Sequence, residues 1–587
     1  MRKLIHNLFE MDLSSTLLER VEENSYFSSN FFAKLTYPFE KNVNELDPQF
    51  IYHYNRLYYT KMYPECIWNE WGEIEEAKLY VLSSKGSIIS FQIVTGFDNF
   101  PNFDKKLSEL NLHHVFPDNL YNHAASLVGK TYPETDYTFP AIHTDLVNTD
   151  NSLFAEFKKT YNLYENGHFI QNSKDNNNRI INYNLIQPVV SLPYLLKKGI
   201  EDAGYSLEGN VLQHELIKKL WVFKANAYSS ATYPDSVEWL INKSNSRVQK
   251  NYYKNEQEIP FNGTFRITGK AYLLGWGNIF RIRDLFTGKI IWEPKTSKNT
   301  ENVDFTITTT KDTVLEFSAN DPGAGFTGEK ILELRIIPIT ILDDEGKVIN
   351  PNFDSPEIDL RKYVPDITFG DLIKAMKNTF NLDLYRKGKV IHMNFIDSNV
   401  KDYSNIKNLN EYEVLDPVIT FNDAISFLLK FQYEDEQYPF DSLYVDKSGS
   451  KTSSYEELEN TNEVNSPVIP LPRILRNNTN SAKYLTDDGS YLPLIIYTGL
   501  VNGKNESQSN SSLLWPQLYT SFWKEWLKFR IFSESFTWEF TAPKEKMKDL
   551  DVKTKIHAYN RTHIIKKITR SDLSENVEHI ELDTYSE

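Results

Sequence analysis

A glycine pattern at Gly323–Gly328 has the G-x-G-x-x-G spacing of a loop that binds the pyrophosphate of a dinucleotide. In such a site the last glycine opens a helix, because the phosphate is bound at the helix N-terminus. The residues that follow here, Ile331–Ile337, alternate in character and include several β-branched side chains, which predicts a strand. The pattern therefore predicts a hairpin loop and no cofactor.

Histidine residues could bind a metal, but their spacing does not favour it. His214 and Glu215 begin like the H-E-x-x-H zinc helix, yet Lys218 occupies the position of the second histidine. The adjacent His113 and His114 lack a nearby carboxylate and histidine set at metal-binding spacing, which predicts a solvated loop pair. Neither feature predicts a metal site.

Motifs for nucleophilic or acid–base catalysis are also lacking. The sequence has no G-x-S-x-G elbow, and its 80 acidic residues single out no pair for glycoside hydrolysis. A Ser/His/Asp triad is assembled in space and leaves no local spacing, so the sequence leaves that alternative open. We expect no catalytic, cofactor-binding or metal-binding residues, and a protein that is not an enzyme.

Three aromatic residues could form a flat platform for a sugar, since aromatic faces suit the apolar faces of sugars. They are Tyr272, Trp276 and Trp292. The alternative is that these rings pack in the core or at the rim of a β-sandwich.

A second aromatic group lies near the C-terminus. Its spacings of three, four and seven residues are typical of one helix face. The residues are Trp515, Phe522, Trp523 and Trp526, followed by Phe529 and Phe532. The pattern indicates burial against a neighbouring domain or subunit, and aromatic enrichment favours an interface.

The composition is that of a large acidic protein able to form packed cores. Of 587 residues, 40% are hydrophobic and 14% are aromatic, and the length suggests about four domains. The net charge of −16 lacks the clustered positive charge that nucleic-acid binding needs, so we expect no sequence-specific nucleic-acid partner. Cys66 is the only cysteine, which excludes an internal disulfide and a cysteine-rich zinc site.

Targeting and membrane signals are absent from the sequence. No uninterrupted apolar run reaches the length of a transmembrane helix, so we expect no stable membrane insertion. Near the N-terminus, Leu4 and Ile5 are followed by His6 and Asn7, which interrupt a signal-like core. We expect synthesis and folding in a reducing cytosol.

Strands dominate the predicted secondary structure. Near the N-terminus, Lys78–Leu82 and Ser87–Val94 are rich in β-branched and aromatic residues, with Gly86 in the turn between them. Between about 258 and 342, closely spaced short strands predict a small β-sandwich. Those strands are Thr264–Thr268, Ala271–Leu274, Phe280–Arg283, Lys289–Trp292, Asp304–Thr309, Thr313–Phe317 and Ile331–Ile337.

Two segments, Pro188–Lys197 and Pro365–Lys374, match each other at a constant offset. Each predicts a helix capped at its N-terminus by a hydroxyl residue, Ser191 in the first and Thr368 in the second. Each helix would end in a left-handed residue, at Gly204 and at Asn381, before strand-like sequence. One interpretation is that any amphipathic helix followed by a hairpin looks like this. The other is a duplicated unit, with the sandwich inserted between its copies.

These helix units and the C-terminal part resemble the tail-tip or baseplate hub proteins of bacteriophages and prophages that infect Bacteroidetes. The resemblance covers most of the chain, as a general pattern of residue types together with a few short motifs. It is carried by Leu192–Leu196, Ala203–Gly209, Leu216–Phe223, Ile367–Phe380, Tyr385–Met393, Leu514–Trp526, Phe536–Phe540, Ile556–Ile568 and His579–Asp583. A weaker likeness extends to Tyr26–Ser29 and Tyr37–Phe39.

The resemblance implies a mainly β fold with short helices (α+β) and several domains. Two related β-barrel-like hub domains with packed helices would be accompanied by the inserted sandwich. The expected segments are an N-terminal β-rich hub domain (1–115), a hub segment with the first repeat helix (116–257), and the sandwich (258–345). The second repeat helix with its strands (346–430) and a C-terminal β-rich closure with polar loops (431–587) would follow.

The function that the resemblance implies is structural. The chain would form a ring that joins the tail tube to the baseplate, fibres or spike. The expected ring has three subunits, and a ring of six is the second choice. Two similar domains per subunit let three subunits contact a sixfold tube. The protein would be made in the host bacterial cytoplasm and reside in the virion. The alternative function is a surface protein that binds or cleaves glycans with its sandwich.

Overall fold

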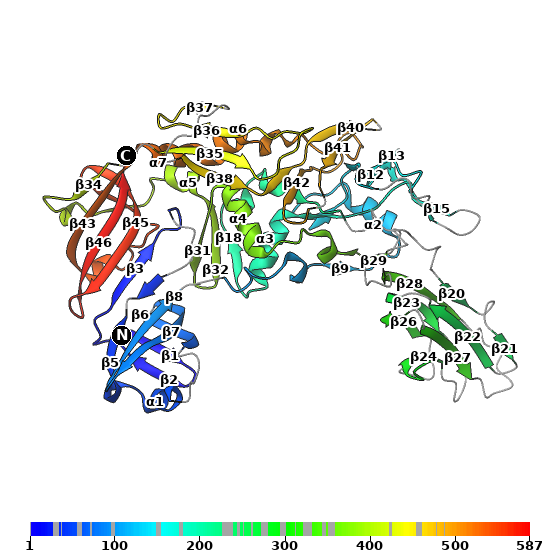
Figure 1. Ribbon diagram of the computed structural model, residues 1–587, viewed down its shortest axis with the longest axis horizontal. Coiled ribbons are helices and arrows are strands. Elements are labelled where there is room, and N and C mark those ends of the chain that lie inside the picture. Colours follow the sequence, from blue (N-terminus) through cyan, green and yellow to red (C-terminus); the bar gives the residue numbers. More distant parts are fainter. Residues whose placement is uncertain are drawn as a thin grey trace.

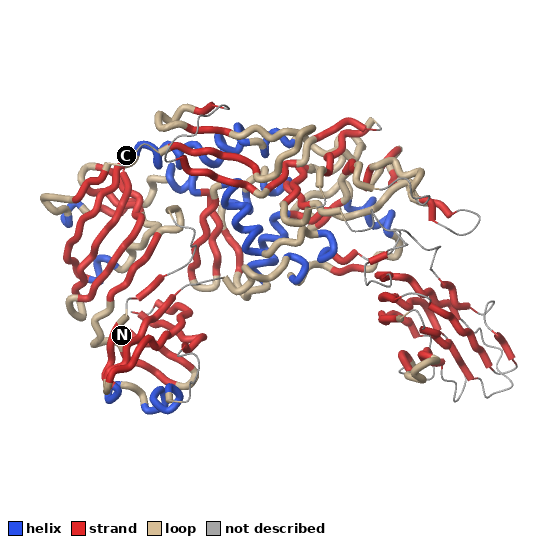
Figure 2. Tube along the Cα trace, viewed as in Figure 1, coloured by secondary structure: helices blue, strands red, loops and turns tan. Residues whose placement is uncertain are grey.

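The computed structural model is mainly β, with several sheets and a few short helices (Figure 2). It describes residues 2–586 except 28–33, 37, 56–61, 71–72, 96–99, 148–153, 175–179, 226–238, 243–246, 250–251, 260–261, 272–279, 294–300, 311–312, 321–331, 343–347, 350–357, 422–424, 453–460, 477 and 487. Two β lobes, containing the N- and C-terminal strands, lie at one end of the molecule (Figure 1). A central body separates them from the sandwich at the other end (Figure 1).

The N-terminal lobe is an antiparallel sheet around a core that includes Phe50 and Phe91. The predicted hairpin is confirmed, because two adjacent strands meet at Gly86, whose φ of +62° suits glycine. The elements of this lobe are β1 (Arg2–His6), β2 (Phe9–Asp12), β5 (Phe39–Asn42), α1 (Pro48–Tyr54), β6 (Met62–Glu70), β7 (Glu73–Lys85) and β8 (Ile88–Thr95).

The C-terminal lobe belongs to the same sheet. Strand β3 (Glu19–Glu23) pairs with β45 of this lobe, and β4 (Lys34–Thr36) pairs with both β3 and β8. The two ends of the chain are therefore joined edge to edge in one sheet. The elements of the C-terminal lobe are β33 (Ile406–Asn408), β34 (Val418–Thr420), β43 (Glu534–Pro543), α8 (Lys544–Met547), β44 (Lys555–Ala558), β45 (Arg561–Asp572) and β46 (Val577–Ser586).

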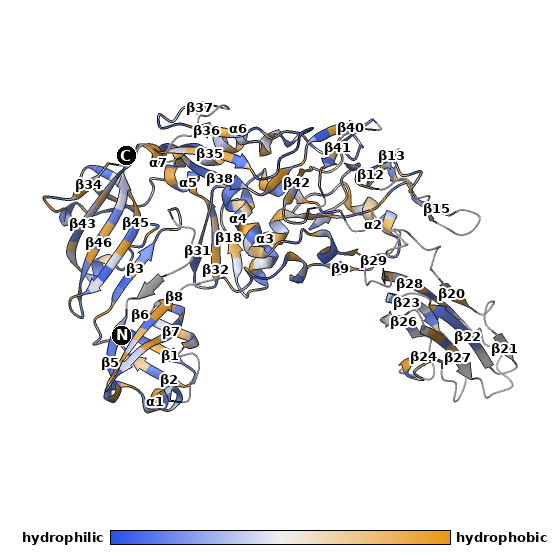
Figure 3. Cartoon of the chain, viewed as in Figure 1, coloured by the Kyte–Doolittle hydropathy of each residue, from blue (hydrophilic) through white to orange (hydrophobic). Residues whose placement is uncertain are grey.

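The predicted β-sandwich is confirmed as two five-stranded sheets around a separate core that includes Phe265, Phe317 and Ile336. Orange and blue alternate along several of its strands, as expected for one buried and one solvated face (Figure 3). Strands that precede residue 258 also pair into both sheets. Its strands are β20 (Trp239–Asn242), β21 (Arg247–Gln249), β22 (Tyr252–Ile259), β23 (Asn262–Ala271), β24 (Phe280–Asp284), β25 (Ile290–Trp292), β26 (Glu301–Thr309), β27 (Thr313–Asn320), β28 (Leu332–Leu342) and β29 (Val348–Ile349).

Both predicted helices form in the central body, as α3 (Leu192–Glu201) and α4 (Phe369–Phe380). The Thr368 hydroxyl accepts a hydrogen bond from Asp371 N (3.1 Å), which confirms the predicted capping box. The Ser191 hydroxyl makes no such cap hydrogen bond. Asn381 and Gly204 adopt the left-handed conformations expected after each helix, with φ of +52° and +82°.

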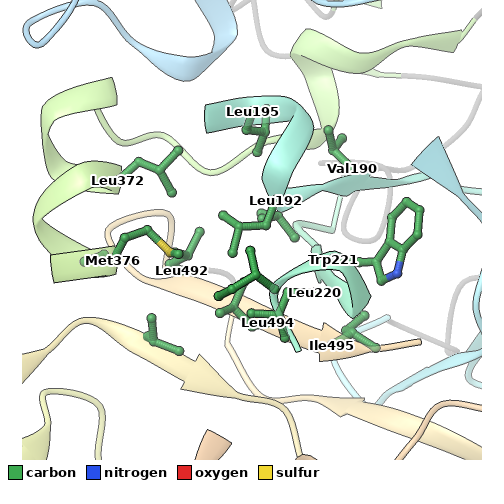
Figure 4. Packing of buried hydrophobic residues seen from close by; sticks show 14 of the residues in the cluster. Val190, Leu192, Leu195, Leu220, Trp221, Leu372, Met376, Leu492, Leu494 and Ile495 are labelled. Carbon is green, nitrogen blue, oxygen red and sulfur yellow. The ribbon is translucent and has the colours of Figure 1, made fainter. Parts of the chain in front are cut away.

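The two helices share one core rather than occupying separate hub domains. Leu192 and Leu195 of α3 lie in the same cluster as Leu372 and Met376 of α4 (Figure 4). After α3, strand β18 (Ser206–Glu208) pairs in parallel with β32 (Val390–Phe395), which follows α4 and β31 (Leu382–Lys387). The two helix units therefore complete each other, because each buries its apolar helix face in the same interior.

The remaining elements complete the central body and its covering strands. The segment boundaries expected at 115, 257, 345 and 430 stay predictions. The helices include η2 (Leu107–Glu109), α2 (Leu120–Leu127), η3 (Val211–Gln213), η4 (Ile217–Lys219), η6 (Leu360–Tyr363), α5 (Ile396–Lys401), α6 (Trp515–Leu518) and α7 (Lys524–Phe532). The strands include β17 (Val189–Ser191), β19 (Leu220–Val222), β35 (Ser426–Phe431), β36 (Leu443–Val445), β38 (Thr461–Ser466), β39 (Val468–Pro470), β40 (Arg473–Arg476), β41 (Thr479–Tyr484) and β42 (Leu492–Ile496).

The contact between the two helices can be tested at Gly199. A Cβ atom there would lie 2.1 Å from Cε2 of Phe369, so Gly199→Ala forces the helices apart. Overpacking costs about 1–3 kcal/mol and the helix propensity of alanine returns up to about 1 kcal/mol, so we expect a net loss of about 1–2 kcal/mol in unfolding free energy. Denaturant unfolding measures this loss.

Gly129→Ala is the matched control, because a Cβ at Gly129 meets no atom within 4 Å. We expect this control to unfold like the natural protein. Equal stability of the two variants would contradict the close packing of α3 against Phe369.

Candidate functional site: an exposed edge strand on the C-terminal lobe

The predicted sugar platform is described only at Trp292. Tyr272 and Trp276 lie outside the described residues. The half-buried Trp292 ring stacks on Phe305, with centroids 6.5 Å apart, and meets the Phe280 ring edge-on at 6.0 Å. One part of Trp292 therefore packs against the sandwich core, and a three-ring platform stays a prediction.

The predicted interface aromatics are buried within this chain, and a role for them between subunits stays a prediction. Trp515, Phe522, Trp523 and Trp526 are each at most 6% exposed and belong to the central core. The segment is not one straight helix, because a π-helical turn over Tyr519–Trp523 separates α6 from α7. The wider π-helical turn rotates the side chains of α7 relative to those of α6. The spacing of the aromatic residues in the sequence therefore did not define which residues the rings contact.

Contacts with distant segments account for the burial of these rings. Phe522 stacks on Phe395 with centroids 4.9 Å apart, and the Trp523 indole N–H donates a hydrogen bond to the Thr379 carbonyl at 3.0 Å. Trp526 packs against Phe27 at 5.2 Å. The aromatic segment therefore packs against α4, against the β31–β32 hairpin that follows α4, and against the N-terminal segment.

An exposed apolar strip lies instead on β34, at the end of the sheet that joins the two lobes. Val418 is 63% exposed and Ile419 is 43% exposed, and the flanking Leu415 and Phe421 are 99% and 74% exposed. Within the described residues, β34 pairs with β43 alone, so its other edge has no strand partner. An exposed edge strand with apolar side chains is a template for pairing with another chain.

The rest of the C-terminal lobe positions this strand. Ile419 lies opposite Phe536 of β43, and β43 pairs along its whole length with β46. Phe536 and Trp538 meet the buried His563 ring edge-on, at 5.0 and 5.5 Å. Because the Ala558 carbonyl can only accept, His563 Nε2 donates the 3.0 Å hydrogen bond between them. Burial lowers the pKa of His563 to about 4.

The loop that precedes β34 gives the strip an acidic border. Glu413 accepts a hydrogen bond from the Tyr559 backbone N–H, and the Tyr559 hydroxyl accepts one from Val414 N at 2.9 Å. These bonds anchor the loop and leave Asp416 exposed beside Leu415. The described residues from 409 to 421 include three carboxylates and no basic side chain, and Lys546 of α8 pairs with Glu411 at 3.2 Å.

A buried polar cluster fixes the lobe against the central body. The Lys553 ammonium donates hydrogen bonds to Ser25 Oγ (2.6 Å), Asp383 Oδ1 (2.7 Å) and Asn24 Oδ1 (3.0 Å). Lys377 of α4 reaches the Ser25 carbonyl at 3.2 Å. Burial lowers the pKa of Lys553, and it lowers the pKa of Lys377 to about 8. The cluster thus joins the N-terminal segment, α4, β31 and the C-terminal lobe.

A second ionic cluster joins the two lobes. The buried Arg2 guanidinium of β1 pairs with Glu70 of β6 at 2.7 Å and with Asp572 at the end of β45. Burial alone would lower the pKa of Arg2, but the hydrogen bond and charge of Asp572, together with Glu70, raise it. Lys544 also contacts Asp572, at 2.7 Å. The position of β34 relative to the N-terminal lobe is therefore set by paired buried charges.

The other motifs of the sequence make structural contacts. His214 packs against Phe395 and Phe522 at 5.1 Å, and burial lowers its pKa. His113 contacts Asp136 through Nε2 at 2.8 Å and stacks on Tyr194. Gly323–Gly328 lies outside the described residues.

The described residues contain neither a cluster of potential metal ligands nor a helix that could span a membrane. There, no three or more His, Cys, Asp or Glu side chains gather in a way that could hold a metal ion. No helix of that part of the chain is long and apolar enough to cross a membrane. Burial raises the pKa of the Cys66 thiol to about 12.

No protein-family model matches the chain, and no curated protein matches it. Among solved structures, the chain is similar to a 43 kDa tail protein of prophage MuSo2 from Shewanella oneidensis, with 9% identity and a TM-score of 0.20. That match covers 59% of this chain and 97% of the other. A tail protein from Neisseria meningitidis MC58 matches with 10% identity and a TM-score of 0.19, covering 57% of this chain and 96% of that protein.

A family 35 carbohydrate-binding module from Clostridium thermocellum is also similar, with 13% identity and a TM-score of 0.12. This match covers 20% of the chain and 87% of the module. Identities and TM-scores this low establish neither a common fold nor a common function.

The His563 site predicts how the lobe that carries β34 responds to acid. Between pH 6.5 and pH 4 the unfolded state binds a proton that folded His563 does not, so stability falls as the pH falls, by up to about 3 kcal/mol. Hydrogen exchange of the β43 and β46 amides at pH 6.5 and pH 4.5 measures the loss.

We expect His563→Gln to remove most of this dependence on pH, whereas the exposed His168→Gln keeps it. An unchanged dependence in His563→Gln would show that other groups cause the acid response.

Proposed function

We propose that this protein is a non-enzymatic structural component of a phage tail, a hub or tail-tip protein that forms a ring. The observation that carries the proposal is the joining of two β lobes, one from each end of the chain, in one sheet. A subunit with two such lobes offers two β surfaces, so a ring of three subunits offers six. This number matches a sixfold tail tube.

Two further observations support a structural role. Buried ion pairs centred on Arg2 and Asp383 join the lobes to each other and to the central body. A protein that connects neighbouring tail components needs its own domains to be firmly joined. The sequence resemblance to hub proteins covers the helices α3 and α4 and the closing strands β45 and β46.

The proposed partners follow from this role. The ring would contact the tail tube on one side and the baseplate, fibres or spike on the other, in the virion. The protein would be made in the host bacterial cytoplasm. Its lobes, its central body and the sandwich at the far end of the molecule each offer a surface to such neighbours (Figure 1).

Electron microscopy of the purified full-length protein tests the proposal by counting subunits. We expect rings with threefold symmetry, each subunit contributing two lobes, and retention of tail-tube subunits in pull-down. A monodisperse monomer at high concentration that does not retain tail-tube subunits would overturn the proposal. Rings with sixfold symmetry would keep the function and change the stoichiometry.

A further inference from the structure

A second exposed edge strand lies on the central body. Strand β40 (Arg473–Arg476) ends a four-stranded sheet and, among the described strands, pairs with β41 alone. Leu475 is 65% exposed, and Arg473 and Arg476 are exposed on either side of it. Neither arginine forms an ion pair with a described residue. This edge therefore combines an apolar side chain with unpaired positive charge.

The two exposed edges are complementary and lie far apart. The β34 edge is apolar with an acidic border, whereas the β40 edge is apolar and basic. The two strands lie at opposite ends of the body formed by the lobes and the central sheets (Figure 1). One chain therefore cannot pair its own β34 with its own β40.

We propose that β34 of one copy pairs with β40 of the next copy, in a head-to-tail contact that repeats around the ring. The proposal deepens the proposed function and rests on it, since it names the contact through which subunits associate. Backbone groups of the two edges would pair as in β-augmentation, Leu475 would cover part of the apolar strip, and the arginines would face Asp416. Contacts between two different surfaces of one chain generate closed rings when the rotation closes.

The other end of the joined sheet is a poorer partner for β34. Strand β2 exposes Glu10 and Asp12 on its outer face. Among the described residues, Glu10 forms an ion pair, with Lys3, and Asp12 forms none. Asp12 would face the carboxylates that border β34, and like charges across an interface disfavour pairing. Charge therefore selects β40 over β2.

The contact is small, because β34 and β40 span only three and four residues. A single pair of copies would therefore associate weakly. In a closed ring each copy makes two such contacts, and the last contact forms within one assembly, which raises its effective concentration. Association should also weaken with salt, because the arginines and Asp416 are exposed.

Charge exchange in the full-length protein tests the contact, with sedimentation velocity as the readout. We expect Asp416→Arg, and separately Arg473→Glu with Arg476→Glu, to weaken self-association at least tenfold, since each places like charges across the contact. The triple variant that carries all three substitutions exchanges the two signs and should associate like the natural protein. An equimolar mixture of the two weakened variants should form mixed pairs more readily than either variant alone, because their altered edges are complementary. The mixture should not close rings of three, because two variants cannot alternate around an odd number of subunits.

Matched controls test whether the loss of association depends on the position of a residue or only on its charge and exposure. Glu165→Arg reverses an exposed charge on the Tyr164–Phe169 hairpin, which is part of neither β34 nor β40. Ile74→Ser removes an apolar side chain that is 64% exposed, against 65% for Leu475. We expect both controls to associate like the natural protein, and Leu475→Ser to associate more weakly. Circular dichroism of each variant confirms that it is folded.

The outcomes distinguish this contact from the proposed function. Rings that form equally well in every charge variant would overturn the β34–β40 contact and leave the hub function standing. A folded triple variant that fails to associate, or a natural protein that never associates, would also overturn the contact. Loss of tail-tube binding by the natural protein would overturn the hub function instead.

Discussion

The pairing of β3 with β45 is the constraint on which the rest of the structure depends. It brings Glu19–Glu23 beside Lys567–Ser571, at the other end of the chain, and makes one sheet of two lobes. Arg2, Glu70 and Asp572 then meet as buried charges that compensate one another. Removing one partner from a buried ionic cluster leaves an uncompensated charge, which costs about 3–5 kcal/mol. These charges therefore favour this one arrangement of the lobes.

An open sheet always has two terminal strands, and proteins must protect or use them. Here the terminal β34 is short, apolar and bordered by carboxylates, and the unrelated edge of β40 is short, apolar and bordered by arginines. Shortness limits uncontrolled aggregation, while opposite charge gives selectivity. In the proposed contact, the opposite charges of the two edges would select one orientation of association.

Local signals in the sequence were predictive where the relevant contacts are local. The capping box at Thr368, the left-handed Asn381 and the turn at Gly86 depend on a few neighbouring residues, and all three form as expected. The sandwich strands follow from their alternation and close spacing. The β34 strip could have been noticed as Leu415–Phe421, but exposure of Val418 and Ile419 is not distinguishable from burial in a short apolar run.

The sequence by itself therefore determined the Gly86 hairpin, the Thr368 cap, the sandwich strands and the matching of two helix units, because these reflect backbone preferences and the period of apolar side chains. Only the tertiary structure decided that the two helices share one core, and that Trp515 and Trp526 are buried within the chain. It also decided which strands remained at the sheet edges. Those outcomes depend on contacts between residues hundreds of positions apart, which leave no periodic signal along the chain.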